Sequence, residues 1–262
     1  RGEPGSEEYN NMFHDWLNQR TDGLLKDEVA KERIFDETVM GLASTTFFKA
    51  SWLDKFNSEY STEGIFNGAK GEETCTYMKD EYYTTYFWGD KFSAVGRPLN
   101  DGNMMLFVLP AEGVSVEQML SDDEYLEFMA CYGRYMCFNE SYENSGVYRV
   151  NLAVPKFDVR ARKDIASSLK AMGVTDIFDS TKSDFSPLSK TNLFVSTVNQ
   201  ACRVMIDENG CTGASYIVMM MEGAGVGPMD QEVDFTLDRP FVFSVVTNSG
   251  LPLYMGVVNS VE

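Results

Sequence analysis

Apolar residues recur every three or four positions in three stretches of the chain, residues 8–20, 116–132 and 163–172. This is the spacing of one face of an α-helix, so it predicts three amphipathic helices. Gly23 follows the first stretch and Gly173 follows the last, where glycine commonly ends a helix. The apolar members of the second stretch are Met119, Leu120, Leu126, Phe128 and Met129.

Other segments have the composition and alternation of β-strands. Residues 38–52 are rich in apolar and β-prone side chains and predict a buried strand, and residues 148–154 alternate apolar with polar positions. Residues 100–103 (NDGN) predict a hairpin turn between strands at residues 94–99 and 104–109. A further strand is predicted over residues 194–206, with an apolar face that comprises Phe194, Val198, Cys202, Val204 and Ile206.

A long connection, residues 207–232, separates the strand over residues 194–206 from one that begins at Val233. Connections in compact domains are usually far shorter, and long ones are commonly functional or disordered. This one is small and nearly uncharged over residues 210–215, then apolar and β-prone over residues 216–221. Such a segment is a hazard beside a sheet because it can add itself to a strand edge, so its retention favours a use for it. The alternative interpretation is an ordinary hairpin with an irregular tip, which composition alone favours.

Short motifs along the chain resemble those of the serpin family. They are FKASW at residues 48–52, LPAEG at 109–113, PKF at 155–157, VTDIF at 174–178, DFS at 184–186, IDENG at 206–210, DRPFVF at 238–243 and LYMGVV at 253–258. They occur in the order of the family. The resemblance extends from residues 8–20, which are similar to the helix that the family calls helix F, to the C-terminal strands.

The resemblance implies an α+β fold of the serpin type, in which a large mixed β-sheet, further sheets and surrounding helices carry an exposed reactive-centre loop. Residues 1–262 would then form a single serpin-like domain, with the reactive-centre loop at residues 209–232. The helices and strands that precede helix F in the family have no counterpart in this sequence. The N-terminal portion of the same protein is therefore expected as a partner.

The resemblance implies a suicide-substrate inhibitor of serine proteases, not an enzyme. The target protease would cut the loop near its tip and form an acyl-enzyme, and the freed segment would enter the main sheet between residues 38–52 and 194–206. The expected hinge of this movement consists of Glu208, Gly210, Cys211, Thr212, Gly213, Ala214 and Ser215. Residues 211–218 contain no charge and no proline on either face of a strand, and Cys211 begins the face that is expected to point inward.

The spacing of the family from Glu208 places the scissile bond between Ala224 and Gly225. The alternatives are Met221, Val226 and Met229. Alanine suits the shallow, apolar specificity pocket of an elastase-like protease, whereas residues 207–232 contain no lysine or arginine for a protease that requires one. The resemblance also assigns Trp52, Ser44 and Gln200 to the breach and shutter, where the sheet parts. The family usually has asparagine and histidine in place of Ser44 and Gln200, which can still form a hydrogen bond with each other.

Charge and cysteine content argue against several classes of partner and cofactor. The net charge of −18 argues against nucleic acid and anionic membrane as partners, since both require a basic surface. No run of apolar residues is long enough to predict a membrane span. The five cysteines show no CxxC spacing, so neither a zinc site nor a disulfide framework is expected, and no cofactor is implied. Inhibitors of this kind meet extracellular proteases, so secretion is expected, while free cysteines leave an intracellular location open.

Three other functions remain compatible with the chain: a non-inhibitory serpin-like binding or chaperone-type protein, an unrelated β-rich binding module, and a hydrolase. The small hinge residues favour an inhibitor over a non-inhibitory serpin, because a charge or a proline there would oppose insertion into a sheet. His14 is the only histidine and is expected on the surface of the first helix, which argues against a hydrolase that uses a catalytic histidine.

Overall fold

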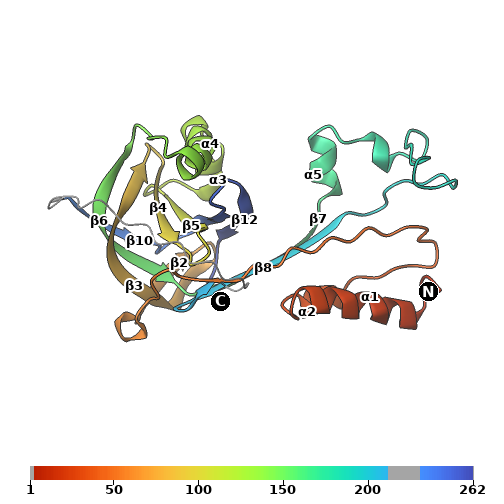
Figure 1. Ribbon diagram of the computed structural model, residues 1–262, viewed down its shortest axis with the longest axis horizontal. Coiled ribbons are helices and arrows are strands. Elements are labelled where there is room, and N and C mark those ends of the chain that lie inside the picture. Colours follow the sequence, from red (N-terminus) through yellow and green to blue (C-terminus); the bar gives the residue numbers. More distant parts are fainter. Residues whose placement is uncertain (1–2, 212–230, 262) are drawn as a thin grey trace. The chain divides into compact units, whose positions relative to one another are not determined.

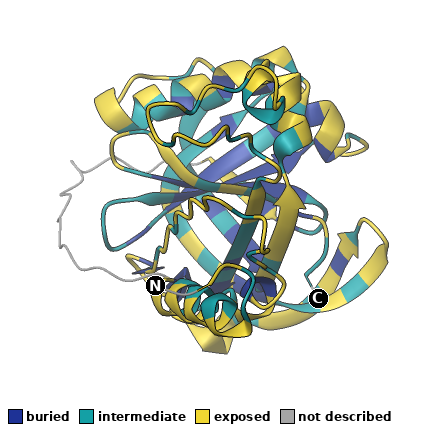
Figure 2. Ribbon diagram, turned by 90° about the vertical axis from the view of Figure 1, so that its right-hand side faces the viewer, coloured by how far each residue is buried: buried dark blue, intermediate teal, exposed yellow. Residues whose placement is uncertain are grey.

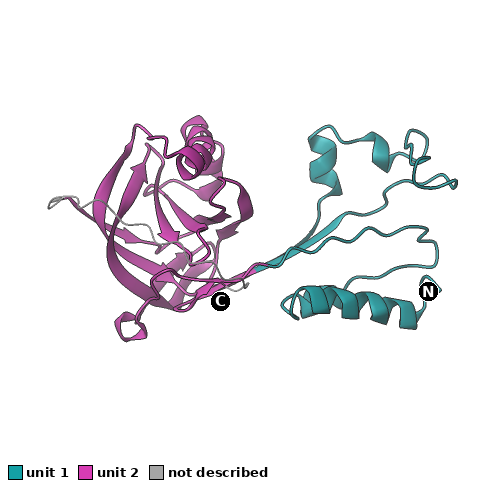
Figure 3. Ribbon diagram, in the orientation of Figure 1, with its two compact units in different colours: residues 1–47, 160–203 teal, residues 48–159, 204–262 magenta. Residues whose placement is uncertain are grey.

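A computed structural model of the chain describes residues 3–211 and 231–261. The chain divides into two compact units, which Figure 3 shows in different colours. The first unit comprises residues 1–47 and 160–203, and the second comprises residues 48–159 and 204–262. Among the described helices, none combines the length and the apolar character that crossing a membrane requires.

The first unit contains helices and irregular segments. Helix α1 (Glu7–Arg20) begins after Ser6, whose hydroxyl oxygen accepts a hydrogen bond from the backbone N–H of Tyr9 at 3.2 Å. This confirms the first predicted helix, although none of its residues is buried. The remaining helical segments of the unit are α2 (Lys26–Val29), α5 (Ala166–Ala171) and the 3-10 turn η2 (Asp176–Phe178). Helix α5 is shorter than predicted because the chain as far as Asp164 is extended in strand β7 (Phe157–Asp164).

An eight-stranded sheet dominates the second unit (Figure 1). The strand order is β10-β6-β3-β4-β5-β11-β12, and β2 pairs with the first part of β3. Strand β10 runs parallel to β6 whereas the other neighbours are antiparallel, so the sheet is mixed. The strands are β2 (Thr62–Gly68), β3 (Gly71–Trp88), β4 (Phe92–Pro98), β5 (Met104–Pro110), β6 (Ser145–Pro155), β10 (Glu232–Thr236), β11 (Phe241–Val246) and β12 (Pro252–Val258), and the turn η1 (Ser58–Tyr60) precedes β2.

The hairpin of β4 and β5 lies where the sequence predicts it. The backbone N–H of Leu99 donates to the carbonyl of Asn103 at 2.9 Å and closes the turn. Gly102 has φ of 82°, a left-handed conformation that glycine adopts without a Cβ clash. The side chain of Asp101 accepts from the backbone N–H of Asn103 at 3.1 Å, so the turn residues also satisfy their own polar groups.

The single helix predicted over residues 116–132 is wrong, because the chain forms two helices there. Helix α3 (Val116–Leu120) ends at Ser121, and helix α4 (Asp123–Phe138) begins after Asp122. The periodicity of apolar residues continues across this break, which is why the pattern does not reveal it. A capping residue within the pattern starts a second helix.

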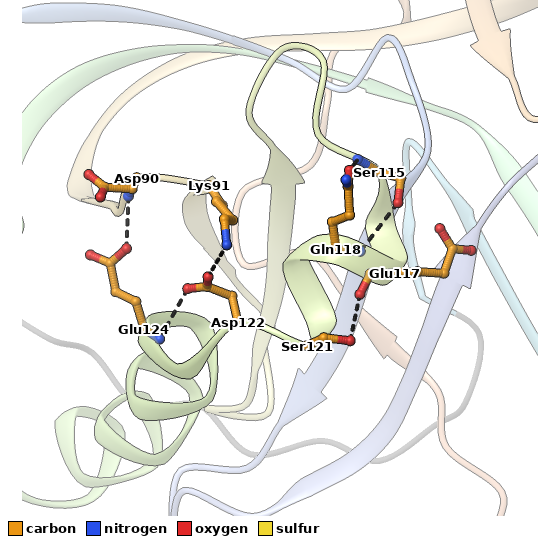
Figure 4. A network of polar contacts seen from close by, with 8 residues as sticks. All are labelled: Asp90, Lys91, Ser115, Glu117, Gln118, Ser121, Asp122 and Glu124. Atoms are coloured by element: carbon orange, nitrogen blue, oxygen red, sulfur yellow. Dashed lines mark hydrogen bonds and ion pairs between the residues drawn. The ribbon is translucent and has the colours of Figure 1, made fainter.

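Polar contacts fix both helix starts (Figure 4). Ser115 and Gln118 form a capping box at the start of α3. The carboxylate of Asp122 accepts from the backbone N–H of Glu124 at 3.1 Å and forms an ion pair with Lys91. The hydrogen bond and charge of Lys91 lower the pKa of Asp122, so the carboxylate stays ionised at the positive end of the helix dipole.

One cluster of the second unit's core lies between these helices and one face of the sheet. The rings of Phe128 and Tyr132 in α4 pack on Phe87 of β3 at centroid distances of 5.4 and 5.5 Å. The other buried members of this cluster are Phe92, Ala94, Leu106, Val108, Val116, Met119, Tyr125, Val242 and Val246. Figure 2 shows buried residues in dark blue on the strands, with exposed residues in yellow along the helices.

The predicted apolar side of residues 116–132 is only partly confirmed. Met119 and Phe128 are buried, whereas Leu126 is 53% exposed. Tyr125 and Tyr132, which the pattern does not count as apolar, are buried instead. Their rings supply apolar area, so a tyrosine at a helical position can face the core.

A second, four-stranded sheet has the order β1-β9-β8-β7, where β1 is Ala50–Ser51, β8 is Asn199–Asp207 and β9 is Gly210–Cys211. The strand predicted over residues 38–52 is wrong for most of its length. Residues 38–48 form no strand within the described part of the chain, and residues 39–44 are exposed. The strand predicted over residues 194–206 begins later, at Asn199. A β-prone segment becomes a strand only where a neighbour completes its hydrogen-bond ladder.

Candidate functional site

The candidate site is the turn at which β8 ends and the chain folds back into the four-stranded sheet. Asp207 pairs with Gly210, and Ile206 pairs with Cys211, so Glu208 and Asn209 form a tight turn. The side chain of Asp207 accepts from the backbone N–H of Asn209 at 2.7 Å and of Gly210 at 3.2 Å. An aspartate that binds the next backbone N–H groups in this way stabilises a chain reversal.

Gly210 allows close contact between strands. Its φ is 155°, and a Cβ at this position would lie 2.2 Å from the carbonyl oxygen of Ala50 and 2.5 Å from Cα of Ser51. No side chain fits at that distance. The approach of β9 to β1 therefore requires glycine.

Strand β9 lies between β1 and β8. Cys211 pairs with Ala50 on one side and Ile206 on the other, and Gly210 pairs with Ser51 and Asp207. Cys211 is 4% exposed. Burial, with a smaller contribution from the charge of Asp101, raises the pKa of the Cys211 thiol to about 12. The start of the predicted loop thus occupies a central position in a sheet.

Three backbone carbonyls of the turn are held from one side by residues that follow β1. The indole N–H of Trp52 donates to the carbonyl of Asp207 at 2.7 Å, and its backbone N–H donates to Asn209 at 3.1 Å. The backbone N–H of Phe56 donates to the carbonyl of Glu208 at 3.2 Å. The Trp52 side chain is buried, with an overall exposure of 1%, and its ring meets that of Phe56 edge-on at 5.6 Å. Trp52, predicted as a breach residue, therefore contacts the hinge directly.

The side chain of Glu208 is held from a different direction. Its carboxylate accepts from Nζ of Lys156 at 2.7 Å and from the hydroxyl of Ser61 at 3.1 Å. Burial acts to raise the pKa of Glu208, but the hydrogen bond and charge of Lys156, helped by its own backbone N–H and Ser61, outweigh burial and lower it. Glu208 is thus ionised at neutral pH and ties the turn to the start of the segment after β6.

Other predicted site residues are not brought together. Ser44 and Gln200 are both exposed, and no hydrogen bond among the described residues joins them, so their assignment to the shutter stays a prediction. The predicted hinge residues Thr212, Gly213, Ala214 and Ser215 lie outside the described residues. So do the predicted scissile residues Ala224 and Gly225 and the alternatives Met221, Val226 and Met229.

Sequence reasoning missed the residues that hold the hinge from outside it. In the sequence, Lys156 stands out only as part of the PKF motif, and no motif includes Ser61 or Phe56. Lys156 lies about fifty residues before the turn, and Ser61 and Phe56 lie about 150 residues before it, so only the folded chain brings them to it. Sequence spacing cannot reveal such contacts, because neither a helical nor a strand period connects them.

The described residues hold no group of three or more histidine, cysteine, aspartate or glutamate side chains arranged to bind a metal ion. In helix α1, Nε2 of His14 lies 2.7 Å from the carbonyl oxygen of Glu32, within hydrogen-bond distance. The chemistry of the hinge is that of hydrogen bonds, one ion pair and strand pairing.

Comparison with known proteins gives consistent matches over nearly the whole chain. The sequence profile of a family described as "Serpin (serine protease inhibitor)" matches residues 5–261. Serpin B6 of Macaca fascicularis is 27% identical over 247 residues, which cover 89% of this chain and 60% of that protein. Leukocyte elastase inhibitor of Homo sapiens is 24% identical over 268 residues, which cover 97% and 67%. The chain thus spans about 60% of the length of the curated relatives that it matches first.

Solved structures share the fold. A crystal structure of maspin superposes with a TM-score of 0.77 at 20% identity, covering 97% of this chain and 66% of that one. Uncleaved ovalbumin gives a TM-score of 0.74 at 20% identity, with coverage of 98% and 64%. The matches agree with the predicted α+β fold with a mixed sheet, further strands and surrounding helices.

Proposed function

The chain belongs to the serpin family, and from this premise we propose that it inhibits a serine protease by acting as a suicide substrate. The family is one of protease inhibitors, so its members bind proteases as targets instead of catalysing proteolysis themselves. The proposal concerns the mechanism, the target and the residues that carry them in this chain.

The position of β9 carries the proposal. Gly210 and Cys211 already pair with β1 on one side and β8 on the other, so a strand begins where further residues can follow. Continuing the same register would place the residue after Cys211 opposite Lys49 and Met205. Once a protease cuts the chain beyond this point, the segment from Thr212 onward is released at one end and can extend β9.

Insertion is favourable because each added residue gains ladder hydrogen bonds and buries apolar side chains. At about 25 cal/mol per Å² of buried apolar surface, a segment of about ten residues releases several kcal/mol. A protease attached to the cut end as an acyl-enzyme would be displaced along with it. Its oxyanion hole and catalytic triad would then be distorted, and deacylation would stall.

We assign the scissile bond to Ala224–Gly225 and the target to elastase-like proteases. The small apolar side chain of alanine fits a shallow specificity pocket. A relative that is named leukocyte elastase inhibitor supports this target class. Residues 207–232 contain no lysine or arginine, which argues against trypsin-like targets. Action outside the cell, and a further N-terminal portion as partner, also stay predictions.

The test is incubation of the protein with a pancreatic or leukocyte elastase, followed by denaturing electrophoresis after boiling. We expect a band at the summed mass of the protease and the larger fragment, and mass spectrometry of the released peptide should locate the cut at Ala224. Elastase with its catalytic serine replaced by alanine provides the control, because it cannot form the acyl bond. Complete cleavage without any complex would refute the inhibitory mechanism and favour a non-inhibitory serpin.

A further inference from the structure

Arg97 of strand β4 is a charged side chain buried inside an aromatic cage. The residue is 2% exposed. Its guanidinium carbon lies 3.8 Å from the ring centroid of Phe56, 5.2 Å from that of Tyr82 and 5.6 Å from that of Trp52. These distances permit cation–π attraction, which is strongest where the cation is removed from water.

The guanidinium of Arg97 is not fully hydrogen-bonded. Its Nη2 donates to Oδ2 of Asp80 at 2.7 Å and to the carbonyl oxygen of Asp54 at 2.6 Å. The buried Nε has no hydrogen-bond partner in the described structure. Burial of a charge with an unsatisfied donor is unfavourable, and an apolar side chain of similar volume would often be as stable. Overall stability is therefore a weak explanation for an arginine at this position.

Two members of the cage hold the hinge turn. Trp52 and Phe56 supply the three N–H groups that bind the carbonyls of Asp207, Glu208 and Asn209. Between them runs a loop whose Asp54 carbonyl is bound by Arg97. Arg97 thus contacts both aromatic rings and the backbone that connects them.

We propose that Arg97 is a positioning residue for the hinge, fixing Trp52 and Phe56 so that their N–H groups keep the turn at residues 207–209 folded. The effect of Arg97 on inhibition rests on the proposed inhibitory function, whereas its effect on the turn does not. With the turn folded, β9 starts between β1 and β8 before cleavage, and the cut segment extends an existing strand instead of nucleating one. Loss of Arg97 loosens the start of insertion and leaves the acyl-enzyme more time to hydrolyse.

Thiol labelling tests the first step without a protease. Cys211 is buried in β9, whereas Cys75 lies in β3 of the same unit and is partly exposed. In Arg97→Leu, alkylation of Cys211, measured by mass spectrometry of peptides, is expected to accelerate about tenfold relative to Cys75. A tenfold factor is the size of effect expected when the turn loses the support of about one charge-assisted hydrogen bond. Arg149→Leu, which removes an ion-paired arginine of the same sheet, should leave the ratio unchanged.

Two further variants separate positioning from stability. Arg97→Leu combined with Asp80→Leu removes the unpaired carboxylate and is expected to recover thermal stability but not slow labelling of Cys211. Arg97→Lys keeps a positive charge for Asp80 but loses the planar stack, and is expected to give intermediate labelling. Parallel acceleration at Cys75 and Cys211, or return of slow labelling in the double variant, would overturn the proposal.

The consequence for inhibition is measured as the number of inhibitor molecules cleaved per protease trapped. For Arg97→Leu we expect about a tenfold rise, the same factor as in labelling, with an unchanged rate of loop cleavage. If the unaltered protein traps no protease while labelling of Cys211 still responds to Arg97, the proposed function fails and the positioning role stands. If trapping is normal and Arg97→Leu leaves the ratio unchanged, the positioning role in inhibition fails.

Discussion

Two residues of the hinge turn, Gly210 and Glu208, act through different physical terms. Gly210 is required for steric reasons, since the backbone of β1 occupies the space that a side chain would need. Glu208 acts through charge, since Lys156 and Ser61 bind its carboxylate. Steric and electrostatic contributions respond differently to pH, so single substitutions can separate them.

Gly210→Ala is expected to lower the free energy of unfolding by about 2 kcal/mol, the usual scale of overpacking in a close contact. The measurement is the midpoint of unfolding in guanidinium chloride. Gly71→Ala is the matched control, because Gly71 also has a positive φ, 138°, but nothing lies within 4 Å of a Cβ there. Equal losses in the two variants would contradict the steric account.

Glu208→Gln is expected to lower the free energy of unfolding by about 1 kcal/mol at pH 7, the scale of one partly exposed ion pair. The pKa of Glu208 is lower in the folded state than in the unfolded chain. Its stabilising effect is therefore complete above the unfolded pKa and is lost as the pH falls through the folded one. Thermal unfolding at pH 7 and near pH 2 should show a difference that vanishes in acid. Glu63→Gln, an exposed position in β2, should show no such difference, and an acid-independent effect at Glu208 would exclude the ion pair as its cause.

Among the elements, helix α3 and strand β9 are short and depend on specific contacts. Helix α3 has five residues, too few to be stable alone, and its capping box supplies hydrogen bonds to its first turn. Strand β9 has two described residues, and its ladder partners on both sides define it. Each element therefore depends on contacts that a substitution can test.

Ser115→Ala is expected to reduce the free energy of unfolding by about 1 kcal/mol, because the backbone N–H of Gln118 loses its acceptor. Urea unfolding provides the measurement. Ser121→Ala serves as the control, since that hydroxyl donates to the carbonyl of Glu117 at the helix end and caps no N–H group. A loss at Ser121 as large as at Ser115 would show that the capping box is not the source.

Ser215→Arg is expected to convert the inhibitor into a substrate that elastase cleaves without forming a complex. Cys211 is buried, and Ser215 is four positions further along the sequence. In an extended β9 it would therefore share the face of Cys211, so its side chain would enter the sheet interior on insertion. A buried unpaired charge costs several kcal/mol. Ala214→Arg, on the opposite face, should retain inhibition. Unchanged inhibition by Ser215→Arg, measured as inhibitor consumed per protease trapped, would refute the inward face assigned here.

At the scale of the whole molecule, the proposed function depends on lengthening of strand β9 within the four-stranded sheet after cleavage. Strands β1 and β9 have two residues each and are the shortest described strands of this sheet. Residues 38–48, which have the composition of a strand, form none in the described part of the chain. Extension of β9 would supply a ladder to neighbours that lack one, so cleavage should stabilise the protein.

Cleavage between residues 221 and 229 is expected to raise the thermal midpoint by at least about 10 °C. Each kcal/mol shifts the midpoint of a chain of this size by about 2–4 °C, and insertion gains several kcal/mol. Differential scanning calorimetry of intact and nicked protein measures the shift. Nicked Ser215→Arg is the control and should show little increase. A nicked protein that melts no later than the intact one would rule out insertion.

The sequence by itself determined the elements whose geometry depends on near neighbours. The apolar spacing of residues 8–20 predicts helix α1, and the NDGN turn predicts the hairpin around Gly102. The family motifs identified the fold, and the IDENG motif led to the turn at residues 207–210, whose Glu208 and Gly210 are predicted hinge residues. These features require only local backbone preferences and a recognisable order of motifs.

Only the tertiary structure decided which β-prone segments pair with a neighbouring strand and which side chains are buried. Residues 38–48 and residues 50–51 share a β-prone composition. In the described structure only residues 50–51 form a strand, because β9 pairs with them. Arg97 and Lys156 carry the same charge in the sequence, yet one lies in an aromatic cage and the other binds the hinge carboxylate. Strand ladders and burial join residues that are far apart along the chain, so their energies cannot be read from local patterns.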